Sequence, residues 1–331
     1  DEVLTRPQPA LIEFVKTLTS PLVILGASGK MGPTLAVLAR RAAEAAGHKL
    51  DVIAVSRFSD ARSRDWLEVR GVRTLACDLF ERESLKTLPD SDNVIYMVGL
   101  KFGTSSNPAL TWAANTLLPA NAAERYPQAR IAALSTGNVY PLASVASGGW
   151  TESAALTPLG EYANSAIARE RIFEYQSARH GTPITILRLS YALDLRYGVL
   201  VDIAQKVFAG QPVDLTSGYL NCIWQGDANA MVIRALALAS SPPTTLNLTG
   251  SEVVSVREVA VRFSELMGRS VQFTGHEAET ALLSKTTLLR ERLGSPTVPL
   301  DMVIHWTAQW IMHGGALLNK PTHFEVRDGA Y

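Results

Sequence analysis

Short apolar runs alternate with longer amphipathic segments through the first two thirds of this 331-residue chain. The runs predict buried strands, and the intervening segments, rich in Ala, Leu and Arg, predict helices. Apolar strands separated by helices are typical of a parallel sheet covered on both faces, so the pattern predicts an α/β, Rossmann-like doubly wound fold. The predicted strands are Leu22–Leu25, Val52–Val55, Thr74–Ala76, Val94–Val98, Ile131–Leu134 and Ile184–Leu189, and the predicted helices are Thr34–Ala46, Thr111–Glu124 and Glu161–Arg179.

The regularity loosens after about residue 190, where helix-like pieces mix with short strands. We expect a dinucleotide-binding domain over residues 1–189, with 1–20 as an N-terminal extension, and a smaller C-terminal substrate-binding lobe over most of 190–331. Some segments of this lobe should return to the main sheet. The helix-like pieces are Val201–Ala209, Ala228–Ala239 and Val256–Met267, the short strands lie near Pro212–Leu215 and Thr245–Leu248, and the tail Asn319–Tyr331 is polar without periodicity.

The composition narrows the classes of function. Lys plus Arg and Asp plus Glu both number 31, and this balance offers no field for a polyanion, so nucleic acid is not an expected partner. No apolar run reaches the ~18 residues of a membrane span, and the start lacks a signal pattern. The two cysteines, Cys77 and Cys222, cannot form a disulfide framework, and the histidines show no metal-ligand spacing. We expect a cytoplasmic protein without a membrane partner or a metal.

A glycine-rich turn follows the first predicted strand and precedes a helix. Its glycines form the pattern G-x-x-G-x-x-G. A backbone without side chains at the N-terminus of a helix lets a pyrophosphate approach free N–H groups and the positive end of the helix dipole. An ordinary strand-to-helix turn also uses glycine, but this placement favours dinucleotide binding. The expected phosphate-binding residues are Gly26, Ser28, Gly29, Lys30, Met31 and Gly32.

The end of the second strand indicates the cofactor. In dinucleotide-binding folds an acidic residue there binds the ribose 2′-hydroxyl of NAD, whereas an Arg receives the 2′-phosphate of NADP. Here the strand ends in Ser56-Arg57 without a carboxylate, which favours NADP over NAD. The alternative is a solvated Arg just beyond a strand.

The order of motifs from about Pro21 to Trp310 resembles the extended short-chain dehydrogenase/reductases, the NAD-dependent epimerase/dehydratase family. The motifs are the glycine-rich turn, Ala76–Leu79, Gly99–Lys101, Leu134–Pro141 and Gly160–Glu170. The resemblance implies a small-molecule substrate and a homodimer formed through two long helices. It also implies cofactor contacts by Asp78, Leu79, Val98, Gly99, Lys101 and Tyr162, with Asn115 as a structural residue beside them.

The family's chemistry is hydride transfer, in which a Tyr exchanges a proton with the substrate hydroxyl and a Ser or Thr holds that oxygen. Tyr162 and Thr136 match these roles. The family's Lys, four residues after the Tyr, is replaced here by Ala166. Free Tyr has a pKa near ~10, so a nearby cation is needed for it to act as a base at neutral pH. The oxidised nicotinamide or Lys101 could supply that charge.

Three functions follow from these residues. The first is an NAD(P)-dependent oxidoreductase or epimerase acting on a sugar, a sugar acid or a similar alcohol. The second is a catalytically silent NAD(P)-binding sensor, which Ala166 would suit, and the third is a non-redox lyase or isomerase in the same cleft. The residues that we expect to contact substrate are Thr136, Asn138, Arg196 and Asn221.

Two of these residues bear on the substrate class. Arg196 could contact an anion or could simply lie on the surface. Asn221 stands where nucleotide-sugar enzymes of the family often have an Arg for the diphosphate. This difference favours a substrate smaller than a nucleotide sugar.

Overall fold

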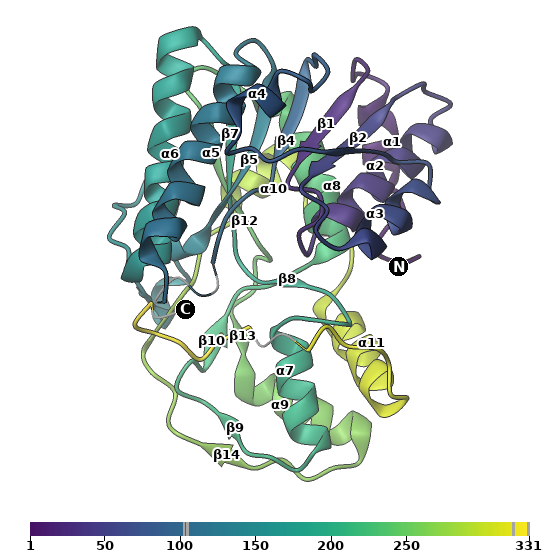
Figure 1. Cartoon of the computed structure of the whole chain (residues 1–331). Coiled ribbons are helices and arrows are strands. Elements are labelled where there is room, and N and C mark those ends of the chain that lie inside the picture. The colour runs from purple at the N-terminus through teal and green to yellow at the C-terminus, as the bar shows by residue number, and fades with distance from the viewer. Residues whose placement is uncertain (102, 104–105, 320–321, 330–331) are drawn as a thin grey trace. The chain divides into compact units, whose positions relative to one another are not determined.

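The computed structural model describes residues 1–101, 103, 106–319 and 322–329 (Figure 1). The tail predicted to lack periodicity falls partly outside these residues, at 320–321 and 330–331. Among the described residues, no helix combines the length and apolar character needed to cross a membrane.

A central sheet organises the fold. In the described chain its seven strands are ordered β12-β7-β5-β4-β1-β2-β3, and the β1–β2, β2–β3, β1–β4 and β4–β5 pairs are parallel. The predicted Rossmann-like fold is therefore confirmed. The chain runs outward from β1 on one side and then outward from β4 on the other, so a topological switch point, where such sheets bind ligands, lies between them. The bounds are β1 Leu22–Leu25, β2 Val52–Ser56, β3 Arg73–Ala76, β4 Asn93–Tyr96, β5 Arg130–Thr136, β7 Ile184–Leu189 and β12 Thr244–Leu248.

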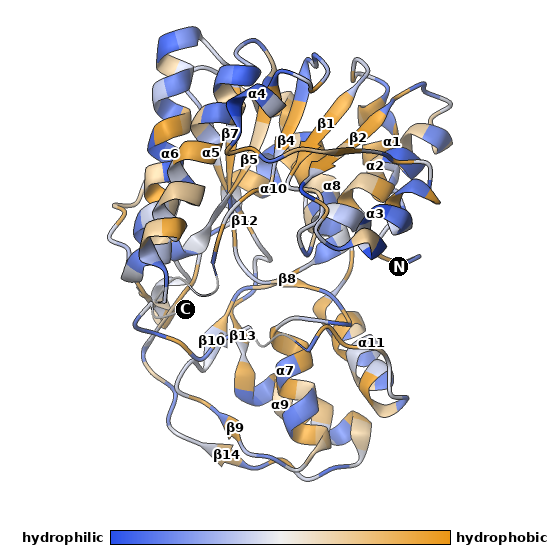
Figure 2. Ribbon diagram, in the orientation of Figure 1, coloured by the Kyte–Doolittle hydropathy of each residue, from blue (hydrophilic) through white to orange (hydrophobic). Residues whose placement is uncertain are grey.

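Helices cover the sheet because successive strand residues face opposite sides. On one side, Val23 and Leu25 belong to a buried cluster with residues of α5 and α6, and the Tyr96 ring meets that of Phe173 at 5.1 Å between centroids. In Figure 2 the strands are orange, whereas the outer helices carry much blue. The helices associated with the sheet are α1 Pro9–Val15, α2 Gly32–Ala45, α3 Ala61–Glu68, α4 Arg82–Leu85, α5 Pro108–Arg125, α6 Gly160–His180 and α8 Gln225–Arg234, with a 3₁₀ turn at Ala235–Leu238.

The end of the fourth strand and the segment after β2 differ from the sequence expectation. The fourth strand ends at Tyr96, two residues before the predicted end at Val98. The polar stretch after β2 contains the helix α3, whose first turn is capped by the Asp60 carboxylate accepting from the Arg62 N–H at 3.0 Å. Only Leu67 of this helix is buried, so its sequence carries no apolar period.

The described chain divides into two compact units. The first comprises residues 1–136, 161–188 and 229–246, and the second comprises 137–160, 189–228 and 247–331. Their predicted roles, cofactor binding and substrate binding, stay predictions.

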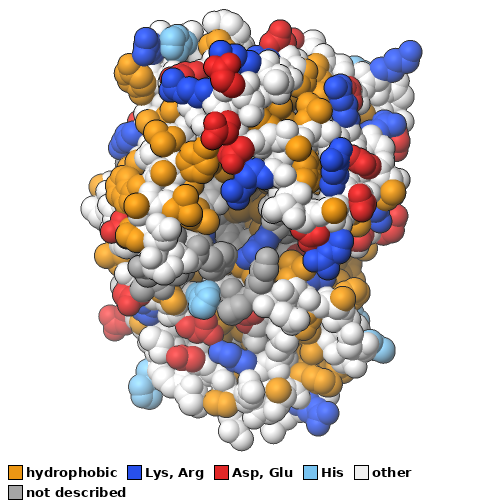
Figure 3. Space-filling view, viewed as in Figure 1, with side chains coloured by type: hydrophobic (Ala, Val, Ile, Leu, Met, Phe, Trp, Pro, Cys, Tyr) orange, Lys and Arg blue, Asp and Glu red, His pale blue; other side chains and the backbone are white. Residues whose placement is uncertain are grey.

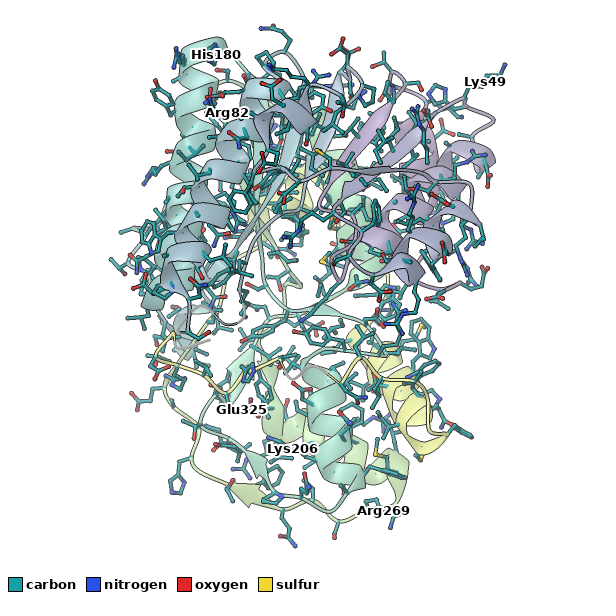
Figure 4. The ribbon with its side chains drawn as sticks, in the orientation of Figure 1. Lys49, Arg82, His180, Lys206, Arg269 and Glu325 are labelled. Atoms are coloured by element: carbon teal, nitrogen blue, oxygen red, sulfur yellow. The ribbon has the colours of Figure 1, made fainter. Side chains whose placement is uncertain are left out.

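In the second unit, α7, α9 and α11 pack against one another. The C-terminal segment is tied to α7 by an ion pair between Lys206 and Glu325 at 2.7 Å (Figure 4). The elements outside the main sheet are β6 Ala143–Ser144, β8 Ala192–Leu193, α7 Val199–Phe208, β9 Val213–Asp214, β10 Tyr219–Leu220, β11 Ile223–Trp224, β13 Val254–Ser255, α9 Val256–Met267, β14 Phe273–Thr274, β15 Thr280–Ala281, α10 Thr287–Leu293 and α11 Leu300–Met312, with 3₁₀ turns at Gly137–Val139 and Val145–Ser147.

Candidate active site

The three glycines of the glycine-rich turn, from the end of β1 to the first residue of α2, differ in what surrounds the place of a side chain. Gly26 has a φ of +86°, and a Cβ there would lie 2.8 Å from a methyl of Val98. A Cβ on Gly32 would lie 2.5 Å from the backbone oxygen of Ala27. A Cβ on Gly29 would meet nothing closer than 3.4 Å. The protein's own packing therefore requires Gly26 and Gly32, whereas the bare backbone at Gly29 leaves open space beside the turn.

A cavity of about 300 Å³ lies beside this turn, where the chain leaves β1, β2, β3 and β4. This is the position expected for a ligand of a doubly wound sheet. The predicted cofactor residues that line it are Gly26, Ser28, Gly29, Ser56, Arg57, Asp78, Leu79, Val98 and Gly99. The other predicted residues, Lys30, Met31, Gly32, Lys101, Asn115 and Tyr162, are not part of its lining.

Sequence reasoning missed several apolar residues of the same cavity. Those on α5 recur every fourth residue, a spacing that places them on one helix face. This stripe is a signal that could have been found. The residues missed are Cys77, Phe80, Met97 and Leu100 from the strand ends, and Leu110, Ala114 and Leu118 from α5.

The polar groups at the cavity differ in how they are partnered. The Ser28 hydroxyl in the glycine-rich turn is hydrogen-bonded to the Ser56 hydroxyl at the end of β2. The Asp78 carboxylate accepts from the backbone N–H of Phe80 at 3.0 Å. Arg57 is exposed and forms no hydrogen bond or ion pair with any residue that the structure describes. Its guanidinium is thus a free cation at the end of β2.

A buried amide fixes the chain where it leaves β4. The Asn115 Oδ1 accepts from the Leu100 N–H at 3.2 Å, and the Asn115 Nδ2 donates to the Leu100 oxygen at 3.2 Å. The same amide nitrogen donates to Ser165 Oγ on α6 at 2.8 Å. The predicted structural role of Asn115 thus has a geometric basis: it joins the end of β4 to α6.

Arg169 on α6 also contacts Asn115. Its guanidinium donates to Asn115 Oδ1 at 2.6 Å and to the Leu134 oxygen at 2.9 Å. A Cβ on Gly99 would lie 2.5 Å from this guanidinium, so the glycine makes room for it. Sequence reasoning did not single out Arg169.

The candidate proton-transfer residues are buried at the ends of their elements. Tyr162 lies in the first turn of α6, and Thr136 is the last residue of β5. Ala166, one turn after Tyr162, is fully buried. The Lys101 Nζ lies 5.7 Å from the centroid of the Tyr162 ring, and burial lowers the pKa of Lys101 from 10.5 to about 8. The cation beside the tyrosine therefore comes from the chain after β4.

A buried ion pair holds α6 against the sheet. The Arg188 guanidinium on β7 donates to the Glu170 carboxylate at 2.7 Å, and both side chains are almost fully buried. The Ser135 hydroxyl on β5 donates to the same carboxylate at 2.5 Å. Because Ser135 precedes Thr136, these bonds fix the end of β5 relative to the helix that carries Tyr162.

The sequence model of the NAD dependent epimerase/dehydratase family matches residues 22–193, which is more than half of the 331 residues and includes the glycine-rich turn, Thr136 and Tyr162. The chain belongs to this family. It is therefore an enzyme of the epimerase/dehydratase type that uses a nicotinamide cofactor. A comparison with curated protein sequences finds no match.

Solved structures of epimerases share the fold of this family member. UDP-glucuronic acid 4-epimerase from Bacillus cereus in complex with NAD has a TM-score of 0.74 and 17% identity, over 89% of this chain and 98% of that one. UDP-glucose 4-epimerase from Thermotoga maritima with UDP-glucose has a TM-score of 0.69 and 16% identity, over 89% of this chain and 99% of that one. An epimerase from Methanothermobacter thermautotrophicus has a TM-score of 0.74 and 16% identity, over 92% of this chain and 96% of that one. At these identities the likeness establishes the shared fold.

Three predicted substrate residues of this epimerase/dehydratase family member, Asn138, Arg196 and Asn221, lie in the second unit and have different surroundings. Asn138 lines a small cavity of about 40 Å³ together with Tyr191, Tyr219 and Arg327, among others. Arg196 lines a different cavity of about 190 Å³. The structure thus does not bring these two residues to one cavity, and their substrate roles stay predictions.

The charge of Arg196 is already balanced. Its guanidinium donates to both oxygens of Asp194, at 3.0 and 2.6 Å, and this carboxylate holds the pKa of Arg196 above its ordinary value. Asn221 is also engaged: its Nδ2 donates to the Glu252 oxygen at 2.7 Å, and its Oδ1 accepts from the Ser284 N–H at 2.8 Å. Within the protein, both side chains support local structure.

The surface carries both signs of charge. On the face shown in Figure 3, Lys and Arg side chains are interspersed with Asp and Glu side chains. No group of three or more His, Cys, Asp or Glu side chains in the described ranges could hold a metal ion.

Proposed function

We propose that this enzyme binds NADP(H) in preference to NAD(H), in the cavity beside the glycine-rich turn. The observation that carries the proposal is the free guanidinium of Arg57 in the lining of that cavity. The β2 end carries Ser56 and Arg57 and no carboxylate, so an added 2′-phosphate would meet a cation rather than a like charge. The open space at Gly29 and the N-terminus of α2 fit the pyrophosphate.

Titration of each cofactor by calorimetry tests this preference. We expect a lower Kd for NADP⁺ than for NAD⁺, with the difference shrinking at high salt because a charge–charge contact at an exposed Arg is screened. Tighter binding of NAD⁺ would overturn the assignment of Arg57.

The proposed reaction is hydride transfer at a carbon that bears a hydroxyl group, leading to oxidation or epimerisation. When bound, the nicotinamide supplies the hydride acceptor. The phenol of Tyr162 takes the proton from the substrate hydroxyl, while the hydroxyl of Thr136 holds the substrate oxygen by a hydrogen bond. In an epimerisation Tyr162 returns the proton to the substrate, and in an oxidation the proton passes to solvent. The burial of both side chains supports these roles, because partial exclusion of water strengthens hydrogen bonds to a developing charge.

The proposed substrate is a sugar, a sugar acid or a similar alcohol. The structural relatives named above include epimerases of UDP-glucuronic acid and UDP-glucose. In this chain Asn221 has no charge and its amide is occupied by protein partners, and Arg196 is paired with Asp194. Neither residue offers a free cation for a diphosphate, which favours a substrate without one.

A substrate panel decides between these classes. Free sugars, sugar acids and UDP-sugars would be incubated with enzyme and NADP⁺ or NAD⁺, with the absorbance of the reduced nicotinamide as the readout. Epimerisation returns the hydride and leaves no net absorbance change, so products would also be analysed by NMR. We expect turnover with a member of the first two classes. Turnover confined to UDP-sugars would contradict the substrate proposal.

We also propose a homodimer formed through α5 and α6, which lie side by side in Figure 1. Large apolar side chains are exposed on both helices: Trp112 and Leu117 on α5 and Tyr175 on α6. Sedimentation analysis should show a dimer that Leu117→Glu converts to a monomer. The control is Val69→Glu, which changes an exposed apolar residue beside α3 and should leave the dimer intact. A wild-type monomer would contradict the proposal.

A further inference from the structure

The helix that carries Tyr162 has no cation one turn after it. Ala166 occupies that position and is fully buried. A tyrosine that accepts a proton near neutral pH needs a positive charge close to its phenol, since the free phenol ionises only near pH ~10. The chain must therefore obtain that charge from another element if Tyr162 transfers protons.

Arg169 is the next cation along the buried side of α6, but its guanidinium forms hydrogen bonds with other residues. Two of its nitrogens donate to the Leu134 oxygen and to Asn115 Oδ1. The third, Nε, has no partner among the residues that the structure describes. Both of these acceptors are neutral, so the guanidinium acts as a brace between β5, α5 and the end of β4.

This brace fixes the residue that precedes Lys101. Asn115 holds the Leu100 backbone through both its N–H and its oxygen. The same amide binds Ser165 Oγ, which in turn donates to the Tyr162 backbone oxygen at 2.9 Å. A continuous series of hydrogen bonds thus connects the backbone next to Lys101 with the helical turn that carries Tyr162.

From this fixed backbone position, the ammonium group of Lys101 lies beside the ring of Tyr162. The Nζ lies 5.7 Å from the ring centroid, within the range of a cation–π contact. Burial lowers the pKa of Lys101 to about 8, so holding the charge there opposes the local environment. A Met or Leu would fill the same space without that cost, which points to a use for the charge.

We propose that Lys101 supplies the positive charge that activates Tyr162, so that the chain after β4 provides what α6 provides in relatives with a Lys at the position of Ala166. Lys101 acts through Tyr162 and is a positioning residue. The proposal rests on the proposed function of Tyr162 in proton transfer. Tyr162 takes the proton of the substrate hydroxyl, and Lys101 keeps its own proton throughout.

The other charged groups near Tyr162 are engaged elsewhere. On α6 itself, the carboxylate of Glu161 accepts from the Trp112 indole N–H at 2.5 Å, and Glu170 is paired with Arg188 of β7. From β4, Tyr96 is fully buried, and burial raises its pKa. Arg169 binds β5 and α5 as described. Among the described residues, Lys101 forms the cation–π contact with the Tyr162 ring.

A titration without substrate or cofactor tests the proposal independently of the reaction. The near-ultraviolet absorbance of tyrosinate would be followed against pH, and the signal of Tyr162 isolated by subtracting the matching Tyr162→Phe variant. The series is wild type, Lys101→Met and Lys101→Arg. Because Arg stays charged while Lys101 loses its proton near pH 8, the midpoint should be lowest for Lys101→Arg and highest for Lys101→Met. We expect these two to differ by about one pH unit or more. Coincident midpoints would overturn the proposal, whatever the substrate proves to be.

The second test asks whether a cation placed on α6 can replace the charge of Lys101. Ala166→Lys in the Lys101→Met background places a cation one helical turn from the phenol, as in relatives, and should return the midpoint toward the value for Lys101→Arg. Circular dichroism confirms the fold of each variant. Lys86→Met is the matched control, since Lys86 is an exposed surface lysine paired with Glu83, and its midpoint should equal that of the wild type. A double variant that stays at the Lys101→Met midpoint would contradict the role of a nearby cation.

Activity then separates this role from cofactor binding. With an active substrate, Lys101→Met should lower kcat at neutral pH at least tenfold and move the pH–rate profile to higher pH, while Lys101→Arg keeps most of the rate. A change confined to cofactor Kd, with an unmoved pH profile, would make Lys101 a cofactor contact and overturn the inference. Absence of turnover with every substrate would contradict the proposed function and would leave the titration result standing.

Discussion

Gly29 and Gly32 lie three residues apart in one turn, yet only Gly32 is required by the packing of the protein itself. A Cβ at Gly32 would lie 2.5 Å from the Ala27 oxygen, whereas the nearest atom to a Cβ at Gly29 is the Gly26 oxygen at 3.4 Å. We propose that the absence of a side chain at Gly29 serves the approach of the cofactor pyrophosphate.

Gly29→Val should abolish dinucleotide binding and leave the fold intact, because the branched side chain fills the space that the phosphates need. Calorimetry with NADP⁺ and the thermal unfolding midpoint are the two measurements. The paired variant Gly32→Ala should lower the unfolding midpoint, since backbone atoms must move. Normal affinity in a folded Gly29→Val protein would remove the phosphate assignment.

Arg57→Ala should erase the preference for NADP. The lost interaction is a hydrogen bond to a charged group, which contributes about 1.5–3 kcal/mol, equivalent to about 10- to 100-fold in Kd for NADP⁺. The Kd for NAD⁺ should stay unchanged. Arg62→Ala is the control, because the Arg62 guanidinium is paired with Asp60. A preference that survives Arg57→Ala contradicts the role of Arg57.

Tyr162→Phe should reduce turnover about 10²- to 10⁴-fold, the usual contribution of a general acid–base residue, with little change in cofactor Kd. The control is Tyr126→Phe, which removes a phenol that donates to the Pro89 oxygen. Full turnover in Tyr162→Phe would show that another group moves the proton.

The stability of the protein should depend on pH through Lys101. Its pKa is about 8 in the fold and 10.5 as the ordinary value, so between these values the unfolded chain binds more protons than the folded one. Stability relative to Lys101→Met should therefore rise as pH increases from about 8 to 10.5, by at most about 1.4 kcal/mol per pH unit. Below pH 8 the difference should be constant. Unfolding midpoints of both proteins across this range are the measurement, and parallel curves would show that Lys101 is not buried as a cation.

Glu170→Gln should destabilise the protein by about 3–5 kcal/mol, because Arg188 would keep a buried charge without its partner. Chemical denaturation of the two proteins gives the difference. In contrast, Glu83→Gln breaks the exposed pair with Lys86 and should change stability by no more than about 1 kcal/mol. An equal loss of stability in Glu170→Gln and Glu83→Gln would show that burial does not set the cost of breaking the ion pair.

The inner strands β1 and β4 could be predicted from sequence because they are buried on both faces and therefore read as apolar runs. Leu22–Leu25 matches its run end to end. The helix α3 could not be predicted in this way because only Leu67 is buried. Its one local signal was Asp60 at the N-cap.

The candidate site was predictable where its residues are contiguous. The glycine-rich turn and Ser56–Arg57 each line the cavity from one short segment. The approach of Lys101 to Tyr162 joins residues far apart in sequence, and it depends on Asn115 and Ser165 from two helices. The pairing of Arg196 with Asp194 was equally invisible, because residues two apart meet only in a particular turn.

The contact of Arg169 with Gly99 has a consequence for sequence evolution. The guanidinium occupies the volume that a side chain at position 99 would need, so a residue larger than glycine there would have to displace it. Displacement would break the hydrogen bonds of this guanidinium to Asn115 Oδ1 and to the Leu134 oxygen. We therefore expect homologues that keep arginine at 169 to keep glycine at 99.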